Sequence, residues 1–154
     1  MQRQRPDFVK AWHLFLPPSC VLARTLWGEA RGESPGGQVT VAWTIRNRVN
    51  DGKTSSWWGE GYAGVCQKPC QFNCWNKNNL NFPYLSSAEQ ILFRELAQAR
   101  IAVDQVIDDK VPDPLGGATH YHAIAMKTPP SSAAPRCSTQ SVSSMMAAFS
   151  ASWF

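Results

Sequence analysis

Three segments with helical periodicity, each bounded by residues that begin or end helices, constrain the fold of this chain most strongly. The first segment follows Pro17-Pro18, with Ser19 as a suitable N-cap, and extends to about Arg31, where Gly32 can end it. Because Leu22, Leu26 and Glu29 are spaced at i, i+4 and i+7, they share one face of this helix.

The second segment begins at Ser34-Pro35, a capping residue followed by proline at the first helical position, and ends at Asn50-Asp51-Gly52. The third begins at Ser86-Ser87, where Ser86 with Glu89, or Ser87 with Gln90, suits a capping box, and it ends near Asp109. The residues predicted to face inward are Val39, Ala42, Ile45 (or Trp43) and Val49 in the second segment, and Leu92, Leu96, Ala99, Val103 and Val106 in the third.

The remaining chain predicts loops and a small β element. Residues 51–85 are rich in Gly, Asn, Trp and Cys without a sustained period, which is typical of ordered loops and of a binding surface. A turn is expected at 112–117, followed by a strand at 119–125. From Thr128 onward the chain is rich in Ser, Ala and Pro, a composition typical of a poorly ordered tail over 128–154. We therefore expect one mainly helical α+β domain spanning 1–154, with its β element near 117–125.

Composition indicates a globular protein with a polyanionic partner. The 154 residues are 44% hydrophobic and 17% charged, with a formal net charge of +4 and seven tryptophans. The absence of a Lys/Arg-rich run argues against nucleic acid. No stretch is typical of a membrane span or a secretory signal peptide. We expect a monomer made in the cytoplasm, without stable membrane insertion.

The five cysteines do not predict a metal site. Cys66, Cys70 and Cys74 have a spacing that matches no zinc or iron–sulfur pattern well, and Pro69 interrupts any helix that would align them. We expect no metal and no cofactor. Buried free thiols, or one disulfide formed after release from the cell, remain open alternatives.

Glu29 is the carboxylate best placed for acid catalysis. It shares a face with two leucines and lies near the negative end of its helix dipole, and both conditions disfavour the charged carboxylate. A carboxylic acid with a raised pKa is the group that protonates a leaving oxygen in glycosidic cleavage. The alternative is a solvated Glu29 paired with Arg24 or Arg31, and periodicity alone does not choose between the two.

Three blocks of sequence, in order, resemble the SleB-type cell wall hydrolases, the spore cortex-lytic enzymes and their phage relatives. The resemblance covers about residues 19–125. The matching stretches are Leu22 to Glu33 with Gly37-Gln38-Val39 and Ile45-Arg46-Asn47-Arg48-Val49, then Val65-Cys66 with Gln71-Phe72-Asn73-Cys74-Trp75, then Asp113-Pro114-Leu115-Gly116-Gly117-Ala118-Thr119-His120-Tyr121.

This resemblance implies a fold similar to lysozyme and lytic transglycosylases, and cleavage of peptidoglycan between N-acetylmuramic acid and N-acetylglucosamine. It implies that Glu29 is the general acid and base, with the C6 hydroxyl of the sugar closing a 1,6-anhydro ring, so that no second carboxylate is required. Residues in the matching blocks are candidates for substrate binding, with packing or loop hydrogen bonding as the alternative: Glu33, Gln71, Phe72 and Tyr121. Asp113 is expected to brace its turn.

The chain departs from the family pattern after the third block. Members of this family usually end in an Ile-Gly-x-His-x-Phe-like strand, and residues 126–154 contain no such motif. If that strand supports the groove, its loss affects stability and activity without moving Glu29.

Two other functions remain open. A zinc amidase would take its ligands from His13, His120 and His122, of which the last two share a strand face. A non-catalytic wall-binding module would use the aromatic loops and the positive charge equally well. A short basic wall hydrolase of this kind is typical of a phage endolysin, so we expect a role in phage-mediated host lysis.

Overall fold

The computed structural model describes residues 16–51, 57–87 and 89–121, and these form a bundle of helices around one core. The order of elements is α1 (Pro18–Ala30), α2 (Pro35–Val49), α3 (Gly61–Gln67), the 3₁₀ helix η3 (Asn73–Trp75), α4 (Phe82–Leu85) and α5 (Phe93–Ile107). The predicted mainly helical architecture is confirmed. No helix within the described ranges has the length and apolar character needed to cross a bilayer.

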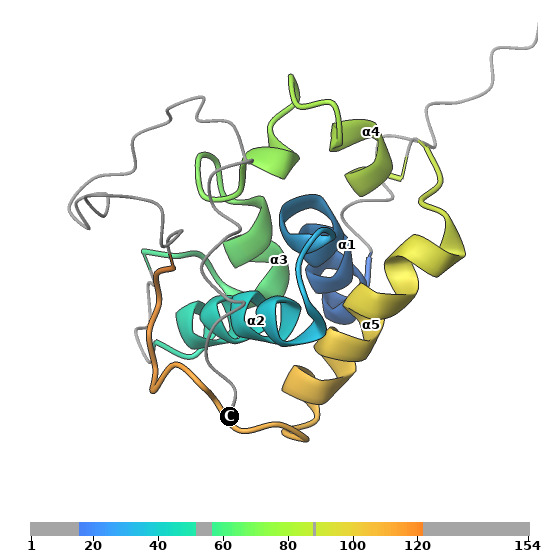
Figure 1. Cartoon of the computed structure of the whole chain (residues 1–154). Helices are drawn as coiled ribbons and strands as arrows, with labels where there is room; N and C mark the ends of the chain where they lie inside the picture. Colours follow the sequence, from blue (N-terminus) through green and yellow to red (C-terminus); the bar gives the residue numbers. More distant parts are fainter. Residues whose placement is uncertain (1–15, 52–56, 88, 122–154) are drawn as a thin grey trace, which may run out of the picture.

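Helix α1 is the centre of this arrangement. Figure 1 shows it enclosed by α2, α3, α4 and α5, and it contacts all four as well as η3. Every residue from Val21 to Ala30 except Arg24 is buried. A helix buried on nearly all sides needs apolar residues around its whole circumference, and α1 has them. The guanidinium of Arg24 donates a hydrogen bond to the Tyr84 carbonyl of α4.

Local capping explains why α2 has the predicted limits. The Ser34 hydroxyl accepts a hydrogen bond from the Gly37 N–H at 3.2 Å, and Pro35 is the first helical residue. At the other end the Asn50 N–H donates to the Arg46 carbonyl at 2.9 Å. The start of α1 differs slightly from its prediction, because Pro17 is the N-cap and Ser19 lies within the first turn.

The predicted start of the third helix at Ser86-Ser87 is wrong. Helix α4 ends immediately before these residues, and Ser87 has a φ of 66°, a left-handed conformation that interrupts a right-handed helix. Residues 89–92 have no helical structure, and α5 begins at Phe93. Leu92 consequently caps the helix and is 66% exposed, whereas the rest of the predicted stripe is buried: Leu96, Ala99, Val103 and Val106.

Within the region predicted as ordered loops, residues 57–85 are described and contain the short helices α3, η3 and α4. This part of the chain therefore has more helical structure than its composition indicated. The predicted turn near 112–117 is present, and Gly116 and Gly117 adopt positive φ within it. The predicted strand is not observed at 119–121, and 122–125 lie outside the described residues. The expected tail at 128–154 also lies outside them.

The central position of α1 predicts a large stability difference between two leucine truncations. Leu22 is fully buried and Leu80 is 91% exposed. Leu22→Ala should lower the free energy of unfolding by about 2–5 kcal/mol, because it removes buried methyl groups and leaves a cavity. Leu80→Ala is the matched control and should stay within about 0.5 kcal/mol of the parent. Chemical denaturation measures both, and equal effects would contradict the assignment of α1 to the core.

Candidate active site

The side chain of Glu29 is in the last turn of α1 and is only 6% exposed. Leu22 and Leu26 lie on the same face of α1 and are fully buried. Because Glu29 shares that face, its side chain also points into the protein interior. The alternative of a solvated Glu29 is therefore wrong for the described structure. The Arg31 guanidinium instead donates to the Trp27 carbonyl at 3.3 Å and lies 4.5 Å from the Trp27 ring centroid.

The 3₁₀ helix η3 supplies the direct polar partner of this carboxyl group. The Cys74 backbone N–H donates to Glu29 Oε1 at 3.1 Å, and the Cys74 thiol is also hydrogen-bonded to the carboxyl. Burial raises the pKa of Glu29 above its ordinary value of 4.5, and the two Cys74 hydrogen bonds oppose this shift without cancelling it. The result is a carboxyl group that holds its proton at a higher pH than an exposed glutamate.

Gly28 lets η3 approach α1 closely enough to make this contact. A Cβ atom on Gly28 would lie 2.7 Å from Cys74 Cβ and 2.9 Å from Cys74 Sγ, closer than non-bonded atoms can be. A second hydrogen bond joins η3 to α1 one turn before Glu29, where the Trp75 indole N–H donates to the Thr25 hydroxyl at 2.9 Å. The glycine inside a helix was the sequence feature that marked this close approach.

The thiols around Glu29 are neutral. Cys66 and Cys74 are both buried and free. Burial raises the pKa of Cys66 to about 12, and burial together with the Glu29 charge raises the pKa of Cys74 well above its ordinary value. The alternative of buried free thiols therefore describes these two residues, while Cys20 is a free but only partly buried thiol and Cys137 lies outside the described residues.

Tyr121 lies near Glu29 and packs against the core. Burial raises the pKa of its hydroxyl, and the negative charge of Glu29 raises it further. The phenol therefore stays protonated and can donate a hydrogen bond. Among the four residues predicted to bind substrate, Tyr121 is the one whose pKa is raised by the charge of Glu29.

Arg48 organises the segments on either side of Tyr121, and the sequence analysis did not assign it to the site. It is 7% exposed, with Nε donating to the Thr119 carbonyl at 2.8 Å and Nη1 donating to Gln71 Oε1 at 3.1 Å. Its guanidinium lies 4.6 Å from the Trp58 ring centroid and 5.3 Å from that of Phe72. Burial lowers the pKa of Arg48 below its ordinary value.

The other predicted binding residues have different environments. Gln71 accepts from Arg48 and donates through Nε2 to the Trp58 carbonyl at 2.9 Å, so both ends of its amide are engaged within the protein. Phe72 is 2% exposed and belongs to the core. These positions favour the packing and loop-bonding interpretation for both. Glu33 is partly exposed in the turn after α1, where slight burial raises its pKa.

Asp113 braces its turn, as predicted. Its carboxylate accepts hydrogen bonds from the Leu115 N–H at 2.8 Å, the Gly117 N–H at 2.7 Å and the Asn47 amide at 3.0 Å. Burial acts to raise the pKa of Asp113, but the hydrogen bonds from these three donors lower it overall.

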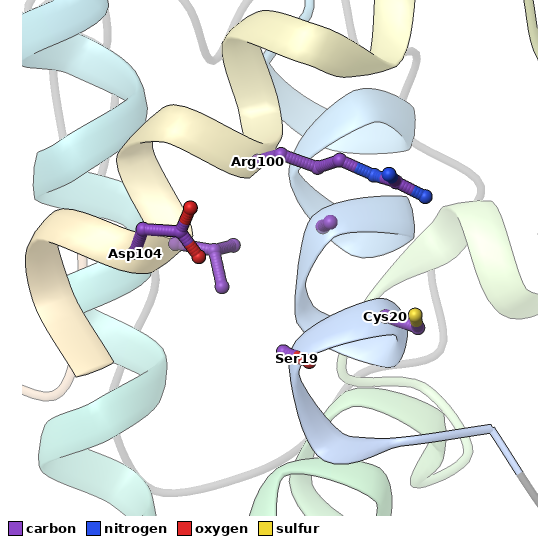
Figure 2. Close-up of a pocket in the computed structure, with 6 residues that line it drawn as sticks. Ser19, Cys20, Arg100 and Asp104 are labelled. Carbon is purple, nitrogen blue, oxygen red and sulfur yellow. The ribbon is translucent and has the colours of Figure 1, made fainter. Parts of the chain in front are cut away.

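A pocket of about 250 Å³ lies elsewhere, between the first half of α1 and α5. Figure 2 shows the side chains that line it, which are Ser19, Cys20, Ala23, Arg100, Val103 and Asp104. It includes neither Glu29 nor the residues around that carboxyl group.

Within the described ranges no cluster of three His, Cys, Asp or Glu side chains is arranged to hold a metal ion. Of the three proposed zinc ligands only His120 is described, beside Thr119 and the Trp58 ring.

The comparisons with known proteins identify the class. A family model described as cell wall hydrolase matches residues 32–146, which begins just after Glu29. A curated spore cortex-lytic enzyme from Halalkalibacterium halodurans is 34% identical over 101 residues, which covers 66% of this chain and 26% of that protein. The chain therefore spans about a quarter of the length of this relative. No solved structure matches.

By family this helical domain therefore groups with the cell wall hydrolases. It belongs to the SleB-type cell wall hydrolase family.

The close contact at Gly28 predicts a sharp difference between two glycine substitutions. Gly28→Ala should destabilise the protein by about 1–3 kcal/mol, because its methyl group overlaps Cys74 and displaces η3. Gly32→Ala is the matched control, since a Cβ at Gly32 has no heavy atom within 4 Å. Urea unfolding of both variants tests this, and a neutral Gly28→Ala would show that η3 does not rest on α1 as described.

The opposite pKa shifts of Glu29 and Asp113 predict opposite pH dependences of stability. The raised pKa of Glu29 means that the folded protein binds more protons than the unfolded chain above pH 4.5, so this residue costs increasing stability as pH rises through its folded pKa. Glu29→Gln should therefore gain stability relative to the parent as pH increases. Asp113, with a lowered pKa, stabilises the protein above its ordinary value of 3.8, and this contribution is lost on acidification.

Denaturation curves between pH 3 and 8 measure both trends. The stability deficit of Asp113→Asn should shrink as pH falls. Parallel curves for Glu29→Gln and the parent across this range would contradict the raised pKa of Glu29.

Proposed function

We propose that this protein cleaves the glycan strand of peptidoglycan, with Glu29 as its single general acid and base. The observation that carries the proposal is the buried Glu29 carboxyl group, whose pKa burial raises and whose Oε1 is held by the Cys74 N–H. A general acid in glycosidic cleavage must be protonated before it meets the leaving oxygen. A buried carboxyl group with a raised pKa meets that requirement.

The reaction needs one proton transfer in each direction. With Oε1 engaged by Cys74, the proposal assigns the transferable proton to Oε2. Glu29 donates it to the bridging glycosidic oxygen as the bond from C1 of N-acetylmuramic acid to that oxygen breaks. The resulting carboxylate then takes the proton of the C6 hydroxyl, whose oxygen bonds to C1 and closes a 1,6-anhydro ring. Glu29 ends protonated, so the cycle is balanced without a second carboxylate.

A water molecule in place of the C6 hydroxyl would complete hydrolysis by the same proton transfers. Both the muramidase and the lytic transglycosylase outcomes thus use the same acid, and they differ only in the nucleophile. The proposal favours anhydro-ring formation, because the C6 hydroxyl belongs to the substrate and reacts intramolecularly with C1, whereas a water molecule would have to be positioned separately. A lysozyme-like or lytic-transglycosylase-like fold is proposed with it, and its support is the helical bundle with the acid at the end of the central helix.

Near Glu29 the protein provides hydrogen-bond donors rather than a metal-binding cluster. Burial and the Glu29 charge raise the pKa of Tyr121, so its phenol stays protonated and can donate a hydrogen bond to a sugar hydroxyl. Arg48 holds the segment that carries Tyr121 through the Thr119 carbonyl. We assign Tyr121 to substrate contact and Arg48 to positioning.

Glu29→Gln tests the proposal directly. The amide cannot donate a carboxylic proton, but its oxygen can still accept from the Cys74 N–H, so the fold should be retained. Release of soluble muropeptides from purified peptidoglycan should fall by on the order of a hundredfold to ten-thousandfold, the usual contribution of a general acid. Mass spectrometry of the products of the parent should show anhydro ends. Glu60→Gln, at an exposed position before α3, is the control and should leave the rate unchanged.

Three outcomes would contradict the proposal. Unchanged cleavage by Glu29→Gln would remove Glu29 from the reaction. Loss of activity on addition of a chelator, with peptide release from the sugar, would favour the zinc amidase. Retention on the wall without any cleavage by the parent would favour a binding module.

A further inference from the structure

An aromatic surface lies between the end of α2 and the start of α3. We define the aromatic shelf as Trp57, Trp58, Lys68 and His120. The two indole rings pack edge to face, with centroids 4.7 Å apart at 88°, and His120 packs against Trp58 with centroids 5.1 Å apart. The Lys68 ammonium lies 4.5 Å from the Trp57 centroid. Trp57 is 47% exposed, so a large aromatic side chain and a cation are presented together at the surface.

Two neighbouring side chains hold Trp58 in place. The guanidinium of Arg48 lies 4.6 Å from the Trp58 ring centroid, and the Gln71 amide donates to the Trp58 carbonyl at 2.9 Å. Arg48 also donates to Gln71, which connects the two supports. An aromatic side chain that is already held in place loses little conformational entropy when a ligand packs against it. These contacts hold Trp58, and Trp57 in turn packs edge to face against the Trp58 ring.

The shelf includes the residue that precedes Tyr121 in the chain. His120 directly precedes Tyr121, which is close enough to Glu29 for that charge to raise its pKa. Arg48, which supports Trp58, also donates to the carbonyl of Thr119. The shelf and the candidate catalytic acid are thus joined by one short segment, residues 119–121.

We propose that the aromatic shelf is a glycan subsite, in which Trp57 packs against a sugar ring and Lys68 binds a carboxylate of the attached peptide. This inference rests on the proposed function. A pyranose ring presents a face of C–H groups that packs well on an indole, whose π face is negative. The wall polymer also carries carboxylates on its lactyl-linked peptides. The Lys68 ammonium lies over one face of the Trp57 ring, 4.5 Å from its centroid, so the sugar is assigned to the opposite face and the peptide carboxylate to the side of the ammonium.

Co-sedimentation with purified peptidoglycan tests the subsite, with Glu29→Gln as the parent chain so that binding is measured without cleavage. Trp57→Leu, which keeps an apolar side chain but removes the ring, should bind about tenfold more weakly. Trp57→Phe, which keeps a ring, should retain most of the affinity. The full-length chain is used throughout, and thermal unfolding of each variant reports whether it is folded.

Phe93→Leu is the matched control. Phe93 is 76% exposed and has Arg100 6.0 Å from its ring, so it resembles Trp57 in exposure and in having a neighbouring cation. It begins α5, and in Figure 1 α5 and α3 flank α1 on opposite sides. This substitution should leave binding unchanged.

Two substrates separate the roles of the ring and the ammonium group. Lys68→Gln should weaken binding to intact peptidoglycan by about threefold to tenfold, the scale of one partly exposed ion pair. It should have no effect on binding to chitin, a polymer of N-acetylglucosamine that carries neither lactyl groups nor peptides and therefore no carboxylates. Trp57→Leu should weaken binding to both substrates.

The subsite is overturned if Trp57→Leu binds as well as Trp57→Phe, or if Phe93→Leu causes an equal loss. These results are distinct from failure of the proposed function. Cleavage by Glu29→Gln would refute the assignment of the acid, whereas normal binding by Trp57→Leu would refute the subsite alone.

Discussion

The hydrogen bond from the Cys74 N–H to Glu29 Oε1 is the interaction on which the candidate site depends. It joins the last turn of the central helix to a 3₁₀ helix 45 residues later in the chain. Burial alone would make the carboxyl group a costly internal polar atom, because an unpaired buried acceptor loses its hydration without compensation. The Cys74 N–H provides that compensation, while the raised pKa shows that the carboxyl group is still biased towards its neutral form.

A second set of contacts extends from Arg48. The guanidinium is buried, stacked near two aromatic rings and hydrogen-bonded to both Thr119 and Gln71. It therefore connects α2 with the segment that leads into η3 and with the segment that ends at Tyr121. Through these contacts the same cation holds the backbone two residues before Tyr121 and packs against the Trp58 ring. Arg48 would be difficult to replace with lysine, because an ammonium group cannot reproduce two directed hydrogen bonds and planar stacking together.

The sequence predicted those features that depend on neighbouring residues. The limits of α2 follow from Ser34 and Pro35 at one end and Asn50 at the other, and the inward face of Glu29 follows from its spacing to Leu22 and Leu26. The start of α5 was mispredicted because a left-handed Ser87 and the short helix α4 override an apparent capping box.

Features that depend on distant contacts were not predicted. The pairing of Cys74 with Glu29 requires knowledge of the packing of η3 on α1, and Gly28 was its only local indication. Arg48 was part of a matching block, yet nothing in its neighbours reveals that it is buried. Gln71 and Phe72 were selected because they lie in a matching block. The block does not reveal that the Gln71 amide hydrogen-bonds within the protein, or that the Phe72 ring is buried in the core.

The central claim is that Glu29 retains its proton above the pH at which an ordinary glutamate ionises. Carbon-detected NMR titration of the side-chain carboxyl groups, with Glu29 assigned by its absence from the spectrum of Glu29→Gln, measures this directly. The account predicts a midpoint for Glu29 above its ordinary value of 4.5. A midpoint at or below that value would contradict it.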